Sequence, residues 1–282
     1  MLAPFLIMLR EGLEAALIVG INAGYLRQTG RGKWLPAVWI GVFLAAALAL
    51  FVGAALQLAN AAFPQKAQEL FEAIVGLIAV TVLVWMVFWM RRAARSMRGS
   101  LHDSIDTALE GQSGATAVWA LIGMVFFAVA REALESVFFL LAIFQQSTGP
   151  AAAIGAALGI VVSALIGWAI YAGALRLNLA RFFRWTGVFI LFVAAGLLAG
   201  AVQALHEAGL WNGLQGRVWD LSRTLPETGT LGTVLSGILG YRESPTVGEA
   251  VVYVGFLAIT LFFYLRAAPA PSGTMMRRPH HG

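Results

Sequence analysis

The 282-residue sequence contains no cysteine. This absence excludes disulfide bonds, iron–sulfur clusters and thiolate metal sites, so a bound metal must take oxygen, imidazole or thioether ligands. Charged residues are also scarce: they make up 12% of the chain, against roughly a quarter in soluble globular domains. Hydrophobic residues reach 60%, and the mean hydropathy is +0.80. These proportions predict an integral membrane protein.

The net charge of +5 does not indicate a nucleic-acid partner. Lys and Arg stand in short clusters between apolar runs, where they set the orientation of membrane helices. No basic stretch precedes the first apolar run, which begins Met1-Leu2-Ala3-Pro4-Phe5. We therefore expect no cleaved signal peptide, and the first helix stays in the membrane.

Seven apolar segments are long enough to cross a bilayer, which takes about 20 helical residues. We expect an all-α protein with spans at about 3–26, 35–60, 70–90, 116–144, 150–175, 182–205 and 247–265. A shorter apolar stretch, Leu231 to Tyr241, is predicted to be interfacial or re-entrant. The tail 267–282 is rich in proline and basic residues, and we expect it to be disordered in the cytoplasm.

Basic residues follow every second predicted helix. They lie after the first, third, fifth and seventh spans, at Arg27, Arg31, Lys33, Arg91, Arg92, Arg95, Arg98, Arg176, Arg181, Arg184, Arg266, Arg277 and Arg278. Between the second and third spans there is only Lys66. The positive-inside rule then places the N-terminus outside and the C-terminus in the cytoplasm.

Two charged motifs interrupt the apolar helices, Arg10-Glu11-Gly12-Leu13-Glu14 and Arg131-Glu132-Ala133-Leu134-Glu135. Glutamates three apart lie on one helix face, and a charge at mid-bilayer costs at least a few kcal/mol. In a purely structural interpretation, Arg10 pairs with Glu14 and Arg131 with Glu135. That interpretation leaves the carboxylates of Glu11 and Glu132 unpaired, because two arginines and four glutamates have a formal charge of −2. Protons or a hard, oxygen-bound metal ion could balance it.

The chain also indicates an inverted repeat. The first motif enters from outside and the second from the cytoplasm, so the two run antiparallel. Gly41 and Gly53 have the same spacing as Gly155 and Gly167. We predict one permease domain over 1–266, with repeat one at about 1–95, repeat two at about 115–206 and a seventh helix at about 247–265. Transporters built this way place their site at the midplane.

Paired Arg-Glu-x-x-Glu motifs on the first and fourth of seven helices resemble those of the oxidase-dependent iron permease family. The likeness extends to the run Trp85 to Arg91 and to Gly240-Tyr241 followed by Pro245. It implies that Glu11, Glu14, Glu132 and Glu135 bind iron during passage, with Arg10 and Arg131 as supporting ion-pair partners. Ala133 stands where the family often has glycine. Iron is then a substrate, no cofactor is permanently bound, and the protein is not an enzyme.

Further acidic residues lie near predicted helix ends. Glu69 and Glu72 share a face at the outer end of the third span, where they could attract cations, although a solvated helix end explains Glu69 equally well. For His206, Glu207 and Glu249 the pattern favours an interfacial position over an outer cation site. Asp103 and Asp106 could release the ion inside, and a solvated amphipathic loop explains them too. Packing is the better explanation for Met86 and Met90 than a copper site.

The sequence therefore predicts a permease importing ferric or ferrous iron across the cytoplasmic membrane, by alternating access or through a gated channel. Lead or manganese remain alternatives, because carboxylates bind many cations. An intramembrane hydrolase is less favoured, since neither His-Glu-x-x-His nor Gly-x-Ser-x-Gly occurs. The resemblance implies a multicopper oxidase or periplasmic proteins as partners besides iron and lipid.

Overall fold

The computed structural model describes residues 2–93, 115–145, 150–172, 179–227 and 229–266. The predicted sites Asp103 and Asp106 and the tail 267–282 lie outside these ranges. Within them the chain is helical apart from its connections and one antiparallel bridge between Arg217 and Thr246. The helices are α1 (Leu2–Gln28), the short η1 (Gly32–Trp34), α2 (Leu35–Ala62), α3 (Gln65–Ala93), α5 (Ala115–Gln145), α6 (Ala151–Tyr171), α7 (Leu179–Glu207), α8 (Thr230–Leu239) and α9 (Val247–Arg266).

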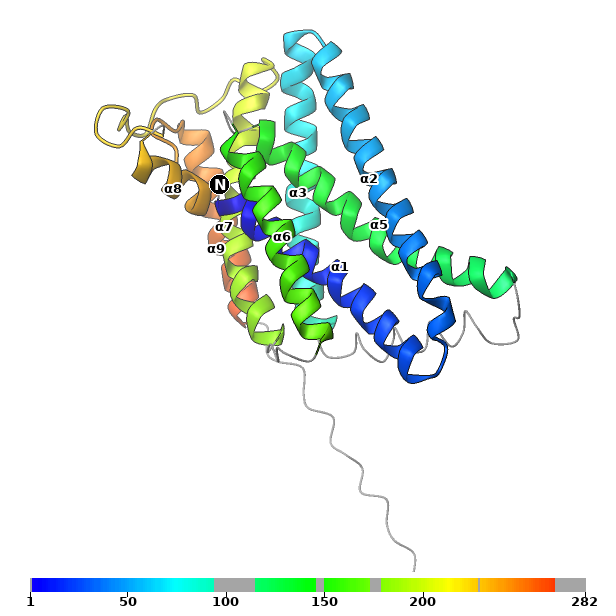
Figure 1. Cartoon of the computed structure of the whole chain (residues 1–282). Coiled ribbons are helices and arrows are strands. Elements are labelled where there is room, and N and C mark those ends of the chain that lie inside the picture. Colours follow the sequence, from blue (N-terminus) through cyan, green and yellow to red (C-terminus); the bar gives the residue numbers. More distant parts are fainter. Residues whose placement is uncertain (1, 94–114, 146–149, 173–178, 228, 267–282) are drawn as a thin grey trace, which may run out of the picture.

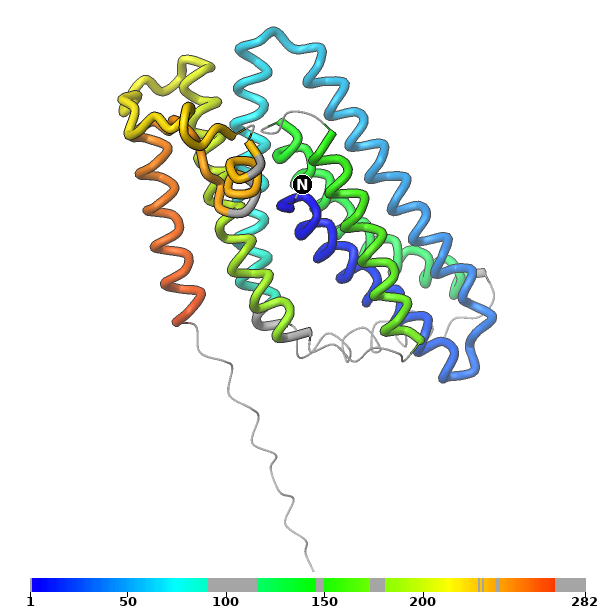
Figure 2. Tube along the Cα trace, turned by 60° about the vertical axis from the view of Figure 1, so that its left-hand side comes forward, coloured from blue at the N-terminus to red at the C-terminus, as the bar shows by residue number. Residues whose placement is uncertain are grey.

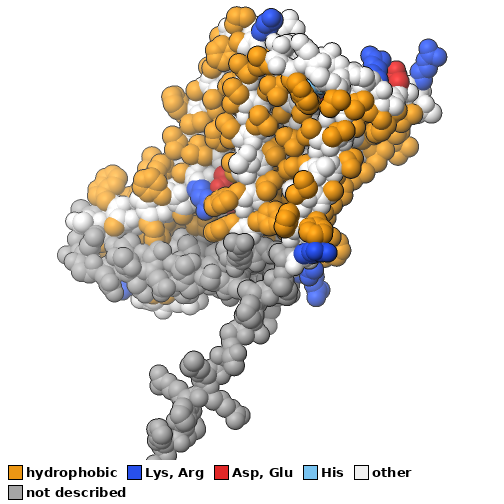
Figure 3. Space-filling model, turned by 180° about the vertical axis from the view of Figure 1, so that it is seen from behind, with side chains coloured by type: hydrophobic (Ala, Val, Ile, Leu, Met, Phe, Trp, Pro, Cys, Tyr) orange, Lys and Arg blue, Asp and Glu red, His pale blue; other side chains and the backbone are white. Residues whose placement is uncertain are grey.

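Six of the described helices are long and apolar enough to cross a membrane: α2, α3, α5, α6, α7 and α9. With 27 residues, α1 is as long as these, but Arg10, Glu11 and Glu14 interrupt its apolar sequence. Apolar side chains cover most of the face seen in Figure 3. The chain is therefore a multi-pass membrane protein, as its composition predicts.

The helices pack in three main pairs, α1 with α6, α2 with α5, and α3 with α7. Helix α9 lies against α7, and α1 crosses α5. Figures 1 and 2 show the α2–α3 connection and the last turns of α7 at one end of the bundle, with α8 and the N-terminus toward that end, and the far ends of α1 and α9 at the other. We call these the α8 end and the opposite end.

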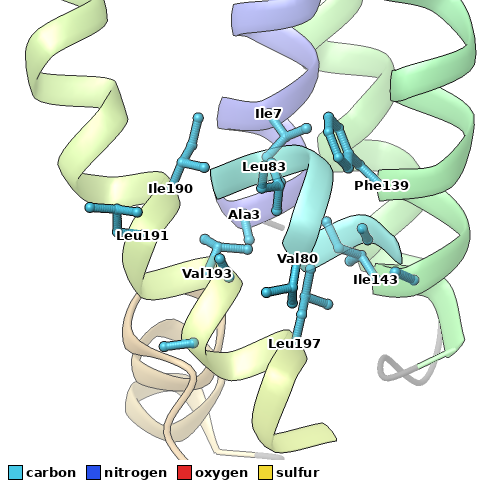
Figure 4. Close-up of a cluster of buried hydrophobic side chains, with 14 of the residues drawn as sticks. Ala3, Ile7, Val80, Leu83, Phe139, Ile143, Ile190, Leu191, Val193 and Leu197 are labelled. Carbon is cyan, nitrogen blue, oxygen red and sulfur yellow. The ribbon is translucent and has the colours of Figure 1, made fainter. Parts of the chain in front are cut away.

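The largest core cluster lies where α1, α3, α5 and α7 meet (Figure 4). Ile7, Leu83 and Phe139 are fully excluded from solvent there. Inside a membrane the driving force for such packing is van der Waals contact rather than the hydrophobic effect. Met86 and Met90 are only 1% and 2% exposed, which agrees with packing as their role.

Small residues let the paired helices approach closely. A Cβ added to Gly159 of α6 would lie 2.5 Å from the Phe5 carbonyl oxygen of α1. A Cβ on Gly41 of α2 would lie 2.9 Å from the Ile122 carbonyl oxygen of α5. Both contacts are with backbone, which cannot rotate away, so these crossings depend on glycine.

Gly159→Ala should destabilise the protein by about 1–3 kcal/mol, because the new methyl group overlaps the backbone of α1. Thermal unfolding in a fixed detergent measures the change. Gly123→Ala in α5 is the matched control, since a Cβ there meets nothing within 4 Å and alanine favours a helix. Equal melting temperatures for the two variants would contradict the close crossing.

The connection between α7 and α9 contains α8, ten residues long and too short to span a membrane. It covers most of the apolar stretch Leu231 to Tyr241, for which an interfacial or re-entrant position stays a prediction. Gly240 ends α8 with φ of 63°, and a Cβ on Gly196 of α7 would lie 2.9 Å from its Cα. Glu227 and Glu243 fix the loop, since each carboxylate accepts the other residue's backbone N–H at 2.9 Å.

Candidate metal site

The two charged motifs meet where α1 crosses α5. Glu11, Glu132 and Glu135 each offer a carboxylate oxygen, and these three oxygens lie within 4.8 Å of one another. Glu11 is 1% exposed and Glu132 is 6% exposed. Elsewhere in the described ranges, no other group of three potential metal ligands of the His, Cys, Asp and Glu types comes as close.

Glu14, the fourth predicted ligand, belongs to a buried ion pair. Its Oε1 lies 3.2 Å from Nε of Arg10, which is itself 1% exposed. The other Arg10 contacts are Oε1 of Glu11 at 4.0 Å and the Phe183 ring, whose centroid lies 6.0 Å from the guanidinium carbon. Glu14 also contacts the Glu132 side chain. Glu14 thus lies next to the group of three carboxylates, which does not include it.

The second arginine has different surroundings. Nε of Arg131 lies 3.0 Å from Oε1 of Glu135. Its guanidinium lies over the rings of Trp85 and Trp89, at 5.0 and 4.9 Å, and those two rings stack on each other. The Arg131 side chain is 39% exposed. The two i, i+4 pairs predicted from the sequence are both present, but only the one on α1 is fully buried.

The carboxylates retain unused acceptors. Neither Glu11 oxygen, nor Oε2 of Glu135, has a hydrogen-bond partner among the described residues. Buried acceptors and charges of this kind are costly unless they are paired or coordinate a metal. Three oxygen ligands with no sulfur or imidazole beside them suit a hard cation. Arg10 and Arg131 limit the net negative charge and hold Glu14 and Glu135 in place.

A large cavity of about 1090 Å³ opens at the α8 end. Five glutamates line it, namely Glu69, Glu72, Glu207, Glu227 and Glu243. Ala3, Pro4 and Ile143 contribute to its wall. Pro4 lies seven residues before Glu11 on α1, so about 10 Å of helix separates this wall from the metal ligands. Ile7 and Phe139 fill that layer.

The structure divides the predicted outer residues between two cavities. Glu69 contacts Glu207 across the large cavity, and Glu72 lies close enough to both to feel their charge. His206 and Glu249 line a second cavity of about 320 Å³, which Glu207 also borders. Glu249 is 3% exposed and accepts a hydrogen bond from the Thr246 hydroxyl at 3.0 Å.

Arg242 lies between the two cavities and borders both. Its Nη1 is 3.5 Å from Oε2 of Glu249, and it donates a hydrogen bond to Oε1 of Gln203. Gln203 in turn donates to Glu207 at 2.7 Å. Sequence reasoning did not predict Arg242 or Gln203 as site residues, because they lie in separate segments and match no metal-binding spacing.

Two side chains in the connection between α7 and α9 have shifted pKa values, those of Tyr241 and Asp220. The pKa of Tyr241 is raised, first by desolvation and then by the carboxylates of Glu243 and Glu227. Its hydroxyl donates a hydrogen bond to the Leu225 carbonyl at 3.1 Å. Hydrogen bonds from the Ser222 hydroxyl and backbone N–H lower the pKa of Asp220.

Comparison with known proteins gives a consistent result. The model of the iron permease FTR1 family matches residues 1–269. The chain is similar to a protein of Yersinia pestis named ferrous iron permease EfeU, with 56% identity over 265 residues, 93% of each chain. It is 52% identical over 278 residues, 99% of each chain, to a protein of the same name from Shigella sonnei.

No solved structure matches the fold significantly. The relatives are named as permeases, which are transporters and not enzymes. The comparisons therefore do not support the alternative of an intramembrane hydrolase. Because both the family model and the relatives cover nearly all of it, this chain belongs to the iron permease FTR1 family.

Proposed function

We propose that this protein imports iron across the cytoplasmic membrane and that Glu11, Glu132 and Glu135 hold the ion in transit. The observation that carries the proposal is the meeting of three carboxylates from α1 and α5 inside the bundle. The names of the relatives favour ferrous over ferric iron. Iron is the substrate, and the carboxylate set suits reversible binding because the arginines reduce its charge.

Transport starts at the α8 end, which we place outside the cell. The basic residues Arg27, Arg31 and Lys33 follow α1 at the opposite end, in agreement with a cytoplasmic position. In this arrangement α1 is the seventh spanning helix beside the six apolar ones. The acidic cavity then faces the side from which an oxidase or a periplasmic protein would deliver iron.

An inverted repeat accounts for the helix pairs. In the repeat, α1 corresponds to α5, α2 to α6, and α3 to α7. The α1–α6 pair therefore corresponds to the α5–α2 pair, and the α3–α7 pair corresponds to itself. When the motifs are aligned, Ala16 corresponds to Val137. The nearest side chain to a Cβ on Gly53 is Val137, and the nearest to a Cβ on Gly167 is Ala16. Corresponding glycines thus contact corresponding residues, which supports the repeat.

Uptake of radiolabelled iron tests the function. The protein is expressed in cells that lack their own iron permease, with an empty-vector control. We expect uptake that saturates and that equal concentrations of manganese or lead reduce only weakly. Ready displacement of iron by either metal would favour the alternative, a permease for another cation on the same scaffold.

Glu72→Gln should raise the KM for iron uptake several-fold and change the maximal rate little. The reason is that Glu72 helps to concentrate cations in the outer cavity but lies outside the three-carboxylate group. Asp220→Asn is the control for the loss of a carboxylate, because Asp220 is exposed and does not itself border the cavity, although its partners Arg217 and Ser222 do. A Glu72→Gln variant with unchanged KM, or with only its maximal rate reduced, would contradict an outer role.

A further inference from the structure

The amide of Asn22 is buried without a partner. Asn22 lies in α1 and is 0% exposed, and neither its oxygen nor its nitrogen has a hydrogen-bond partner within the described part of the chain. A buried polar group left unpaired costs about 1–3 kcal/mol. Asn22 is eleven residues after Glu11, which puts both on one face of α1, about 16 Å apart. Asn22 is thus on the face of α1 that carries Glu11, nearer the opposite end of the bundle.

The repeat gives Asn22 a counterpart at the α8 end. When Glu11 is aligned with Glu132, Asn22 of the opposite end corresponds to Ile143 of the α8 end, and Val125 corresponds to Pro4. When Gly53 is aligned with Gly167, Ala37 of the opposite end corresponds to Ala151 of the α8 end, and Val38 corresponds to Ala152. The four residues at the α8 end line the large outer cavity: Pro4, Ile143, Ala151 and Ala152.

Their counterparts at the opposite end are packed tightly instead. Ala37, Val38 and Val125 belong to one core cluster of α1, α2 and α5, with exposures of 4%, 0% and 0%. Asn22 stands on the same side of α1 as Leu26, one turn farther on, which is also in that cluster. Ile143 and Ala152 are themselves only 7% and 4% exposed, so burial alone does not separate the two ends. The difference is that the residues of the α8 end border the cavity of about 1090 Å³, whereas their counterparts border neither of the two cavities described above.

We infer that the structure is the outward-facing state of an alternating-access transporter and that Asn22 lines its closed exit path. The cluster of Ala37, Val38 and Val125 is the inner closure. When α1 and α2 separate from α5 there, the Asn22 amide meets water and offers the first polar group to an ion that leaves the carboxylates. This inference rests on the proposed transport function, and it explains why the amide is unpartnered in the present state.

Single cysteines test the inference, since the natural chain has none. Asn22→Cys and Val38→Cys probe the inner closure, and Ala151→Cys, which is partly exposed and lines the large cavity, is the control at the α8 end. Each variant is reconstituted in vesicles and treated with a charged, membrane-impermeant thiol reagent on either side. Without metal, we expect Ala151→Cys to react from the α8 side at least about tenfold faster than either inner cysteine reacts from any side.

Ferrous iron should then shift the pattern, because a bound ion permits the change to the inward-facing state. We expect faster labelling of Asn22→Cys and Val38→Cys from the opposite side and slower labelling of Ala151→Cys. Inner cysteines that react as fast as Ala151→Cys without metal would overturn the inference, as would labelling that iron leaves unchanged in a protein that transports iron. If iron uptake itself is absent, the proposed function fails, while the metal-free rates still decide whether the inner end is closed.

Discussion

Glu11→Gln and Glu132→Gln should each lower iron uptake at sub-saturating iron by about tenfold to a hundredfold. Glutamine keeps the shape of glutamate but removes the charge and one anionic ligand. Loss of groups that merely orient metal ligands costs about 10- to 100-fold in affinity, so loss of a ligand should cost at least as much. The two residues lie on different helices yet offer oxygens to one group. Initial rates of radiolabelled iron uptake measure the effect.

Asp220→Asn again serves as the control, because it removes a carboxylate from the connection between α7 and α9, and Asp220 is not among the three carboxylates of the site. Surface expression is measured for each variant, so that a fall in uptake can be separated from a fall in protein. Normal uptake in a correctly inserted Glu11→Gln or Glu132→Gln variant would contradict the ligand assignment.

Arg10→Met should destabilise the protein by about 3–5 kcal/mol, the usual cost of removing one member of a buried ion pair. Arg10 is 1% exposed and lies between Glu11 and Glu14, so the substitution leaves two buried carboxylates without their cation. A chain of this size loses roughly 2–4 °C of melting temperature per kcal/mol. Thermal unfolding in detergent should therefore show a drop of about 6–20 °C.

Arg131→Met is the internal comparison. The Arg131 side chain is 39% exposed, and its partner Glu135 is less deeply enclosed than Glu14. The loss should therefore be smaller than for Arg10→Met. Adding Glu14→Gln to Arg10→Met should recover part of the stability, since it removes one of the stranded charges. Equal losses for the two arginine variants would show that the burial difference does not matter energetically.

The sequence predicted the ion pairs within the two charged motifs. Charges in an apolar helix are conspicuous, and the Arg-Glu-x-x-Glu spacing predicts the Arg10–Glu14 and Arg131–Glu135 pairs, which the structure contains. The four glutamates Glu11, Glu14, Glu132 and Glu135 stay the predicted ligands. Glu14 and Glu135 hold equivalent positions in their motifs, and each forms an ion pair with its arginine. An oxygen of Glu135 lies with those of Glu11 and Glu132, whereas Glu14 lies next to that group. Sequence spacing cannot distinguish the two, because the difference depends on how α1 and α5 cross.

The large cavity at the α8 end shows the limit of inference from the sequence. Glu72 and Glu207 could be singled out because charges near predicted helix ends are visible in a sequence, although for Glu207 the pattern favoured an interfacial position over a cation site. Arg242 was not, because its role depends on a loop that folds back onto α7 and brings it to Gln203. Likewise, Asn22 attracts no notice in an apolar helix until its burial and its place in the repeat are known.

Equilibrium binding of ferrous iron to the purified protein is the most direct test of the central claim, that one ion is held jointly by α1 and α5. Affinities are compared for the wild type, Glu11→Gln, Glu132→Gln and the double variant. We predict that each single change weakens binding by at least about tenfold and that the double change costs less than the two single changes added together, as expected for ligands of one shared ion. Unchanged affinity in either single variant, or two fully additive losses, would contradict a joint site.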